Sequence, residues 1–289
     1  MARRTQCDVT EGAQGRDPAM PDPLEITRDF GREAFGEDPD NYDTARPPYP
    51  DWIFETLATR CGLGPGCAAF EAGAGTGIAT RRLLAAGASV VAIEPDARLA
   101  AWLAERAAGP KLKVVNATFE AAPLEDAAFD LGACATAFHW LDEDAALAKI
   151  ARALKPGGWW AMWWNVYAAI DLPDPFHEAT KDLLGGGPVQ LANGVGGRPP
   201  YALDVEARQA AVERAGAFED FRHEQSVWSV EFDPDQIVRL YASYSDMAIR
   251  LPDDRGRVLA ELHRIATEDF AGRVTRNITT ILYTARRRG

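Results

Sequence analysis

Residues 70–78 read FEAGAGTGI, a stretch that places three glycines at alternate positions between an apolar run and a helical pattern. Glycine lets the backbone turn tightly and approach a ligand without a Cβ clash. The helix that follows offers N–H groups at its first turn, where anions and polar ligands bind. The stretch therefore predicts a strand, a ligand-cradling turn and a helix, with a nucleoside-containing cofactor as the ligand.

The flanking sequence extends this pattern into an alternating layout. Residues 67–71 (CAAFE) and 89–93 (SVVAI) are apolar strand candidates on either side of the helical segment 78–87, which makes one βαβ unit. A helical face with Leu99, Trp102 and Leu103 follows. Further strands are predicted at 111–115, 129–135 and 159–164. Alternating strands and helices predict an α/β fold with a parallel sheet.

The C-terminal half departs from this alternation. A helical stripe of Leu147, Ile150 and Leu154 is expected to end at the Lys155–Gly158 stop signal, and further elements are predicted as a helix at 203–216 and strands at 218–232 and around 274–282. The helical stretch 233–270 is too long for a hairpin connection and is expected to pack as a cap. A Pro- and Gly-rich segment, residues 184–200, reads as a mobile loop that could act as a lid.

Domain organisation follows from these segments. Residues 1–23 lack apolar periodicity and are expected to form a disordered tail, with Met20 a possible natural start. Residues 24–289 are expected to form a single domain, with a cofactor-binding core at 42–165 and the substrate loop, helical cap and final strands at 166–289.

Composition limits the classes of partner. A net charge of −12 and a pI near 4.9 disfavour nucleic acid, whose phosphates are gripped by clustered Lys and Arg. No apolar run approaches a membrane span and the first residues lack a signal-peptide core, so we expect a cytoplasmic protein that acts on a small molecule, without a membrane partner, as a monomer or homodimer. Four cysteines (Cys7, Cys61, Cys67 and Cys134) lack metal-ligand spacing and are expected to be reduced, and no metal site is predicted.

Two acidic residues discriminate between cofactors. A dinucleotide fingerprint needs its third glycine at position 78, which is Ile78, and the carboxylate of Glu71 would repel a pyrophosphate while suiting an ammonium and a sulfonium. Glu94, at the end of the next strand, can accept hydrogen bonds from both ribose hydroxyls. This pattern disfavours a nicotinamide-dependent oxidoreductase, which remains an alternative, as does a protein that binds the cofactor without catalysis.

Three stretches, residues 70–96 (FEAGAGTGIATRRLLAAGASVVAIEPD), 129–142 (FDLGACATAFHWLD) and 154–159 (LKPGGW), resemble class I S-adenosylmethionine-dependent methyltransferases. The likeness is to the small-molecule, type 11 branch that includes trans-aconitate methyltransferase-like proteins, and it covers about residues 42–165. It implies a Rossmann-like, doubly wound, mostly parallel seven-stranded sheet with helices on both faces and the helical cap before the last strand. It also implies methyl transfer from S-adenosylmethionine, giving S-adenosylhomocysteine, to a small-molecule acceptor.

The resemblance assigns residues to this cofactor. Glu71, Gly73 and Gly77 would line its methionine end and Glu94 would hold the ribose. Phe119 would present its backbone to adenine, beside Thr118, where the family often has an acidic residue. Arg46, after Tyr42, could pair with the methionine carboxylate. The full set expected to bind the cofactor is Tyr42, Arg46, Glu71, Ala72, Gly73, Gly75, Gly77, Glu94, Pro95, Thr118, Phe119 and Ala135.

His139, just past the fourth strand, is the candidate catalytic residue. It could act as a general base towards an acceptor hydroxyl or amine. Alternatively, its ring packs against Trp140 and hydrogen-bonds cofactor or backbone, which is the interpretation we favour. The acceptor is expected to contact the cap and the loop before it, with Tyr241, Tyr244 and Asn165 as lining residues. A carboxylate acceptor would need no base, whereas an alcohol or phenol would benefit from one.

Overall fold

The computed structural model describes residues 35–167, 172–185 and 199–289. The expected tail, residues 1–23, and nearly all of the expected Gly-rich lid lie outside these ranges, so both stay predictions.

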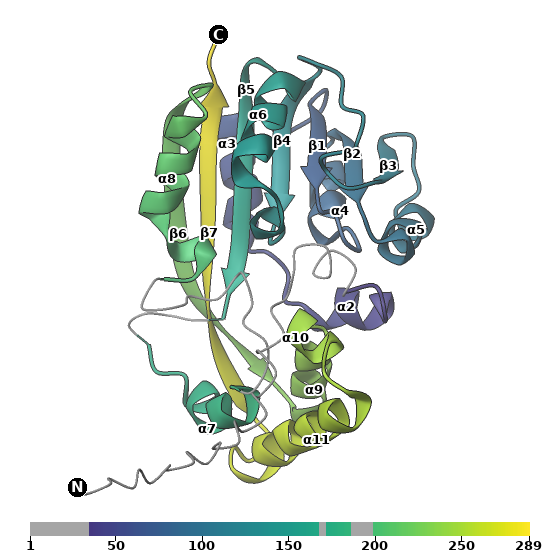
Figure 1. The fold of residues 1–289 in the computed structure, drawn as a ribbon, viewed down its shortest axis with the longest axis vertical. Coiled ribbons are helices and arrows are strands. Elements are labelled where there is room, and N and C mark those ends of the chain that lie inside the picture. The colour runs from purple at the N-terminus through teal and green to yellow at the C-terminus, as the bar shows by residue number, and fades with distance from the viewer. Residues whose placement is uncertain (1–34, 168–171, 186–198) are drawn as a thin grey trace, which may run out of the picture.

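One seven-stranded sheet forms the centre of the molecule, in the order β3-β2-β1-β4-β5-β7-β6 (Figure 1). Strands β1 to β5 pair in parallel, and β7 runs antiparallel to both of its neighbours. This confirms the predicted mostly parallel α/β sheet. The strands are β1 (Ala68–Ala72), β2 (Ser89–Glu94), β3 (Leu112–Asn116), β4 (Phe129–Ala135), β5 (Leu154–Val166), β6 (Phe218–Phe232) and β7 (Val274–Arg287).

The direction in which strands are added reverses at β1, which pairs with β2 on one side and β4 on the other. In open α/β sheets, ligands bind in the crevice at the carboxyl ends of the strands beside such a reversal. The glycine turn that follows β1 lies at this point, so the fold places the predicted cofactor loop where ligand binding is expected.

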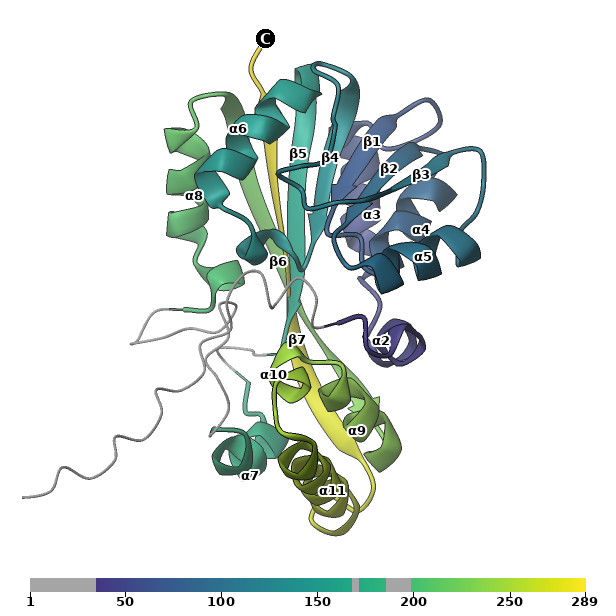
Figure 2. The same ribbon diagram turned by 45° about the vertical axis from the view of Figure 1, so that its right-hand side comes forward.

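Helices cover both faces of the sheet (Figure 2). One face carries α3 (Asp51–Cys61), α4 (Ile78–Ala85) and α5 (Ala97–Arg106), and the other carries α6 (Glu143–Ala153) and α8 (Val205–Arg214). Each face has its own buried apolar cluster, as expected for a sheet whose strands are covered on both sides.

The aromatic strand β5 shows how one strand serves both clusters. Trp160, Met162 and Trp164 pack with α6 and α8, whereas Ala161 and Trp163 pack with α3 and α4. Successive strand side chains point to opposite faces, which produces this division. The tryptophans at positions 160, 163 and 164 are buried and serve core packing.

Gly132 in β4 lets large aromatic rings meet across the sheet. A Cβ at this position would lie 2.5 Å from Cζ of Phe70 and 3.0 Å from Cε3 of Trp160. The two rings stack with centroids 6.4 Å apart. Any side chain here would force them apart, so the small residue is a packing requirement.

Helix α6 ends one residue earlier than its apolar stripe predicts. Leu154 is extended and is the first residue of β5, where it pairs with Phe129 of β4. Its assignment to the helix was therefore wrong. The carbonyls of Arg152 and Ala153 accept hydrogen bonds from the backbone N–H groups of residues 127 and 128 instead of continuing the helix. A buried leucine four residues after Ile150 fits a helical stripe and a first strand position equally well, which explains the error.

The segment between β6 and β7 forms the predicted helical cap. It contains α9 (Pro234–Ala242), α10 (Ser245–Ala248) and α11 (Pro252–Glu268), which lie with α7 (Pro175–Leu184) beyond the carboxyl end of β5 (Figures 1 and 2). Its own buried cluster includes Phe176, Ile237, Leu240, Val258 and Leu262. Within the described ranges, none of the helices combines the length and apolarity of a membrane span.

Candidate functional site

The glycine turn joins β1 to α4 at the carboxyl edge of the sheet. Gly73 and Gly77 have φ angles of +71° and +86°, a region in which a side chain is strained. A Cβ would also lie 2.5 Å from the Cβ of Ala137 at the first position and 2.3 Å from Leu103 at the second. Both glycines are therefore required by conformation and by close packing, and the turn presents its backbone at the surface of the site.

Glu94 ends β2 and is tied to this turn. Its carboxylate accepts hydrogen bonds from the backbone N–H groups of Gly75, at 2.7 Å, and Asp96, at 2.9 Å. The side chain is 4% exposed. Burial raises its pKa to about 7, although the two N–H donors favour the ionised form. The predicted ribose-binding carboxylate thus lies beside the glycine turn, with its position fixed by backbone.

Glu71 lies in β1 beneath the turn and is more deeply buried than the sequence suggested. Its side chain is 1% exposed, and the hydroxyl of Thr80 donates a hydrogen bond to Oε2 at 2.5 Å. Its pKa is raised to about 8, mainly by burial and in smaller part by the nearby Glu94, against the lowering effect of the hydrogen bond from Thr80. Thr80, on the first turn of α4, was not identified from the sequence. Among the described residues, no Lys or Arg forms an ion pair with Glu71.

Tyr42 and Arg46 belong to a segment that a reading of its composition alone would take for a Pro-rich linker, but residues 39–45 form helix α2 (Pro39–Ala45). The Tyr42 ring lies over the glycine turn, with Cε1 3.7 Å from where a Cβ on Gly75 would sit. The Arg46 guanidinium lies 5.2 Å from the centre of this ring and 4.4 Å from that of Tyr244 in the cap.

Arg46 is buried without a carboxylate partner among the described residues. Its Nη2 donates to the carbonyl of Ser243 at 2.7 Å, and its Nε has no hydrogen-bond partner. An unpartnered buried cation is costly unless something neutralises it. The structure therefore places an unsatisfied positive charge next to the ring that covers the glycine turn.

The loop after β3 contains Thr118 and Phe119. The Phe119 side chain is 3% exposed and stacks on Phe70 with centroids 6.0 Å apart, so it points into the core. The backbone of Ala121 and Ala122 donates to the carbonyl of Thr118, which closes the loop into a turn. This arrangement agrees with the expectation that Phe119 serves a ligand through its backbone and not through its ring.

The other three assigned residues lie at the same edge. Ala72 and Ala135 are the last residues of β1 and β4, and Pro95 follows the last residue of β2. The structure thus gathers the sequence-predicted cofactor residues around the carboxyl ends of β1, β2, β3 and β4, with Tyr42 and Arg46 contributed from α2 and its end.

His139 lies in the 3-10 turn Phe138–Trp140 and is 7% exposed. The indole N–H of Trp164 donates to its Nδ1 at 3.2 Å. Indole can only donate, so Nδ1 must be the unprotonated nitrogen and Nε2 carries the proton. The His139 pKa is lowered to about 3, mainly by burial and in smaller part by the cation of Arg208. The ring also packs against Trp140, with centroids 4.7 Å apart.

This geometry favours the positioning interpretation of His139 over the general base. The nitrogen that could accept a proton is already occupied by Trp164, and the other nitrogen can only donate a hydrogen bond. Trp164, within the strand predicted at 159–164, was not identified from the sequence as the partner of His139.

The residues expected to line an acceptor site differ in what they can offer. Asn165 is fully engaged, because its Oδ1 accepts from Thr280 and its Nδ2 points to the carbonyls of Pro47 and Pro48. Tyr241 accepts a hydrogen bond from Arg276 at 2.7 Å. The Tyr244 hydroxyl is buried and has no hydrogen-bond partner among the described residues. Only Tyr244 of the three is therefore available to a ligand.

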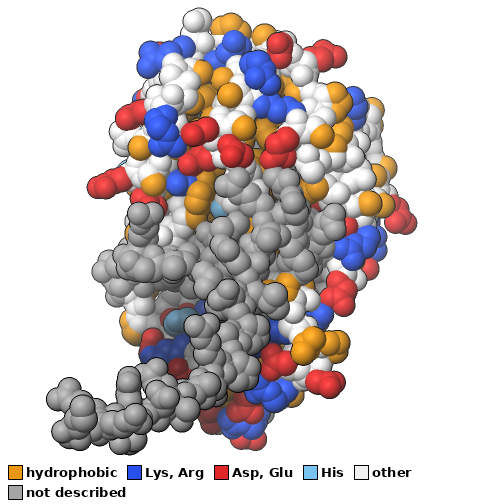
Figure 3. Space-filling model, in the orientation of Figure 1, with side chains coloured by type: hydrophobic (Ala, Val, Ile, Leu, Met, Phe, Trp, Pro, Cys, Tyr) orange, Lys and Arg blue, Asp and Glu red, His pale blue; other side chains and the backbone are white. Residues whose placement is uncertain are grey.

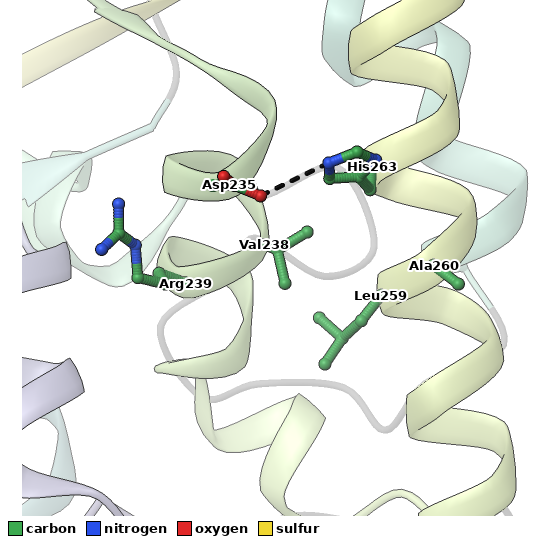
Figure 4. A pocket seen from close by; sticks show the side chains of 6 residues that line it. All are labelled: Asp235, Val238, Arg239, Leu259, Ala260 and His263. Atoms are coloured by element: carbon green, nitrogen blue, oxygen red, sulfur yellow. Dashed lines mark ion pairs between the residues drawn. The ribbon is translucent and has the colours of Figure 1, made fainter.

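A separate pocket of about 480 Å³ lies between α9 and α11 on the cap (Figure 4). Asp235 and His263 face each other across it at 3.4 Å. None of the assigned cofactor residues lines it, so it is distinct from the candidate site. In the part of the chain that the structure describes, no group of three or more His, Cys, Asp or Glu side chains is arranged to hold a metal ion.

Comparison with known proteins shows which proteins this part of the chain is similar to. Residues 70–162 match the family model described as a methyltransferase domain. An uncharacterised methyltransferase of Mycobacterium tuberculosis is 36% identical over 136 residues, covering 46% of this chain and 52% of that protein. The chain thus aligns with about half the length of this relative. An uncharacterised methyltransferase of Schizosaccharomyces pombe is 28% identical over 260 residues, covering 87% of this chain and 96% of the relative.

Among solved structures, a protein of Anaeromyxobacter dehalogenans described as a type II methyltransferase has a TM-score of 0.58 at 20% identity, covering 83% of this chain and 97% of that one. This likeness concerns the fold. The family match runs from the strand that contains Glu71, through the glycine turn and Glu94, into β5. Residues 70–162 are therefore similar to a methyltransferase domain, and the glycine turn and Glu94 lie within the matched part.

Proposed function

We propose that this protein transfers the methyl group of S-adenosylmethionine to a small-molecule acceptor bound between the sheet edge and the cap. The observation that carries the proposal is the glycine turn with the buried Glu94 carboxylate fixed beside it by the N–H of Gly75. A strand-end carboxylate at this place suits two ribose hydroxyls, as the acidic residue does in other nucleoside sites.

Unsatisfied groups around the turn complement the methionine end of the cofactor. Arg46 has a buried Nε and no carboxylate within ion-pair distance among the described residues, and Glu71 is a buried carboxyl that Arg81 influences without forming an ion pair there. The Thr76 hydroxyl in the turn also has no partner there. An amino acid moiety offers a carboxylate and an ammonium, which would pair with the first two. The residues present therefore fit this cofactor.

The bound cofactor supplies a methyl group on a sulfonium, which is electrophilic without further activation. The protein's task is then to align the acceptor with the methyl group and to exclude water. His139 suits this task as a fixed N–H donor that could hold an acceptor oxygen. Because its Nδ1 already accepts from Trp164, acceptors whose nucleophile is ionised at neutral pH, such as carboxylates, are favoured over alcohols.

We infer the position of the acceptor from buried hydroxyl groups in and beside the cap that lack further hydrogen-bond partners among the described residues. The hydroxyls of Tyr244 and of Tyr167, which follows β5, are buried and face each other, and neither has a further hydrogen-bond partner among the described residues. Their rings lie 5.8 Å apart, and Arg46 lies against Tyr244. Polar groups gathered without partners in a buried place indicate a ligand. We place the acceptor against Tyr167 and Tyr244, in place of the earlier set with Tyr241 and Asn165.

The proposal excludes nucleic acid as substrate and leaves a monomer or homodimer as the assembly. Figure 3 shows Lys and Arg mixed with Asp and Glu over the face that it presents, instead of a basic surface. Phosphate backbones are bound by clustered cations, so the mixed charge and the net charge of −12 support a small acceptor.

Two measurements test the proposal. Calorimetry should show one-to-one binding of S-adenosylhomocysteine, and no heat with this ligand together with binding of NAD would favour the oxidoreductase alternative. A methyl-labelled donor should then transfer label to at least one member of a panel of small carboxylic acids, phenols and amines. Binding without transfer to any of them would favour the non-catalytic alternative.

A further inference from the structure

Lys149, on the helix α6, makes three hydrogen bonds to one loop. Its ammonium lies 2.7 Å from the carbonyl oxygen of Phe119, 3.0 Å from that of Glu120 and 2.6 Å from that of Ala122. An ammonium has three N–H donors, so all of its hydrogen-bonding capacity is directed at this loop. Neither the sequence pattern nor the family match assigns this residue a role.

The same loop is held from its other side by the core. The Phe119 ring is 3% exposed and stacks on Phe70, while the ammonium of Lys149 lies 5.2 Å from the centre of the Phe119 ring. Backbone carbonyls turned towards one cation fix the orientation of their peptide planes, because each peptide unit is planar and trans. The loop therefore has one backbone conformation that depends on Lys149 for its carbonyls and on Phe119 for its anchor.

We propose that Lys149 is a positioning residue for cofactor binding, which holds the loop of residues 118–122 in the shape that receives the adenine ring. This rests on the proposed function, in which Thr118 and Phe119 contact the nucleoside. A loop that is already ordered loses less conformational freedom when ligand binds, and this raises affinity without any direct contact from the residue that orders it.

Lys149→Met tests the role, because methionine keeps the unbranched apolar stem and removes the donors. We expect the dissociation constants of S-adenosylhomocysteine and 5′-methylthioadenosine to rise by about tenfold each, since both contain adenine. The ratio of the two dissociation constants should stay unchanged, because the loop contacts the adenine that both ligands share and not the amino acid end that only one of them has. Lys149→Arg, which retains a cation with several donors, should recover most of the affinity.

Lys181→Met on α7 is the matched control, since that ammonium pairs with the exposed Glu178 at 2.7 Å, far along the chain from this loop. The thermal midpoints of the two methionine variants without ligand should agree closely. Should Lys149→Met not fold, Lys149→Gln, with two donors, should bind both ligands with intermediate affinity.

The proposal is overturned if Lys149→Met, or Lys149→Gln in its place, binds both ligands within twofold of the wild type. It is also overturned if the affinity of Lys149→Met falls only together with its thermal midpoint and Lys149→Arg restores neither of the two. A wild-type protein that binds neither adenosine compound would instead remove the proposed function itself, and the two failures are thereby distinguished.

Discussion

Replacing Glu71 by Gln should make the ligand-free protein more stable at high pH than the wild type and should weaken the binding of the cofactor. The Glu71 carboxyl is 1% exposed, and burial raises its pKa to about 8 from an ordinary value of 4.5. A raised carboxyl pKa contributes stability that is present below pH 4.5 and is lost as the pH rises through about 8. At about 1.4 kcal/mol per pKa unit, the loss is on the order of 3–5 kcal/mol at most.

Glutamine has nearly the same shape and can still accept the hydrogen bond from Thr80, but it never ionises. Its buried NH₂ group costs some stability at every pH. The difference between two pH values is therefore the informative quantity. Urea denaturation at pH 5 and pH 8.5 should show that Glu71→Gln gains on the wild type by a few kcal/mol between these values, and Glu55→Gln, at an exposed position of α3, should not.

Cofactor binding gives an independent measurement of the same carboxyl. An ammonium-bearing ligand favours the ionised form, so S-adenosylhomocysteine should bind more tightly as pH rises from 6 to 8. Glu71→Gln should weaken binding at pH 8 by about tenfold to a hundredfold and flatten part of this slope, with Glu94 responsible for the rest. Equal pH dependence of stability in variant and wild type would refute the reasoning.

Three further predictions concern the same site. Glu94→Ala should raise the dissociation constant of S-adenosylhomocysteine by about tenfold to a hundredfold in calorimetry, through the loss of charge-assisted hydrogen bonds, and unchanged affinity in a folded variant would contradict the ribose assignment. Arg46→Met should weaken S-adenosylhomocysteine by a similar factor but leave 5′-methylthioadenosine, which has no carboxylate, unaffected; equal losses would exclude carboxylate pairing. Because the pKa of His139 is about 3, His139 should not titrate between pH 6 and 7, and wild type and His139→Gln should show the same pH dependence of kcat at saturating cofactor in this range. A rise in kcat between pH 6 and 7 that is present in the wild type and absent in His139→Gln would support a general base.

The local parts of the fold were predictable from the sequence. The strands at 129–135 and 218–232 were located to the residue, the first from a mostly apolar run and the second from partly alternating polar and apolar residues. The glycine turn and the strand-end acid followed from short spacings that need no tertiary information. Helix α2 was not predicted, although the signals were present, since Asp38 caps it and Pro39 occupies its first position.

Contacts between distant segments could not be predicted in the same way. Arg46 meets Ser243 across 197 positions of chain, and no periodicity in either segment indicates the pairing. The protonation state of His139 depends on Trp164, a strand residue whose composition indicates only core packing. The three bonds of Lys149 likewise arise from how a helix faces a loop some 30 positions earlier. Such details depend on side-chain direction in the assembled fold.

Helix α2 shows why these long-range contacts matter for function. On one side, Asp40 accepts hydrogen bonds from Trp102 and Arg106 of α5, and Asp43 pairs with Arg81 of α4, so the helix is tied to the elements that follow the glycine turn and Glu94. On the other side, Asn41 donates to the carbonyl of Arg239 in the cap.

Tyr42 and Arg46, which we propose contact the cofactor, belong to the same segment that makes both sets of contacts. Arg46 also donates to the cap carbonyl of Ser243 and lies against Tyr244, where we place the acceptor. A cofactor carboxylate that pairs with Arg46 would therefore bind a side chain whose position the cap helps to fix. The seven-residue segment that composition marks as a linker is, in the folded chain, the element through which the cofactor turn and the cap are joined.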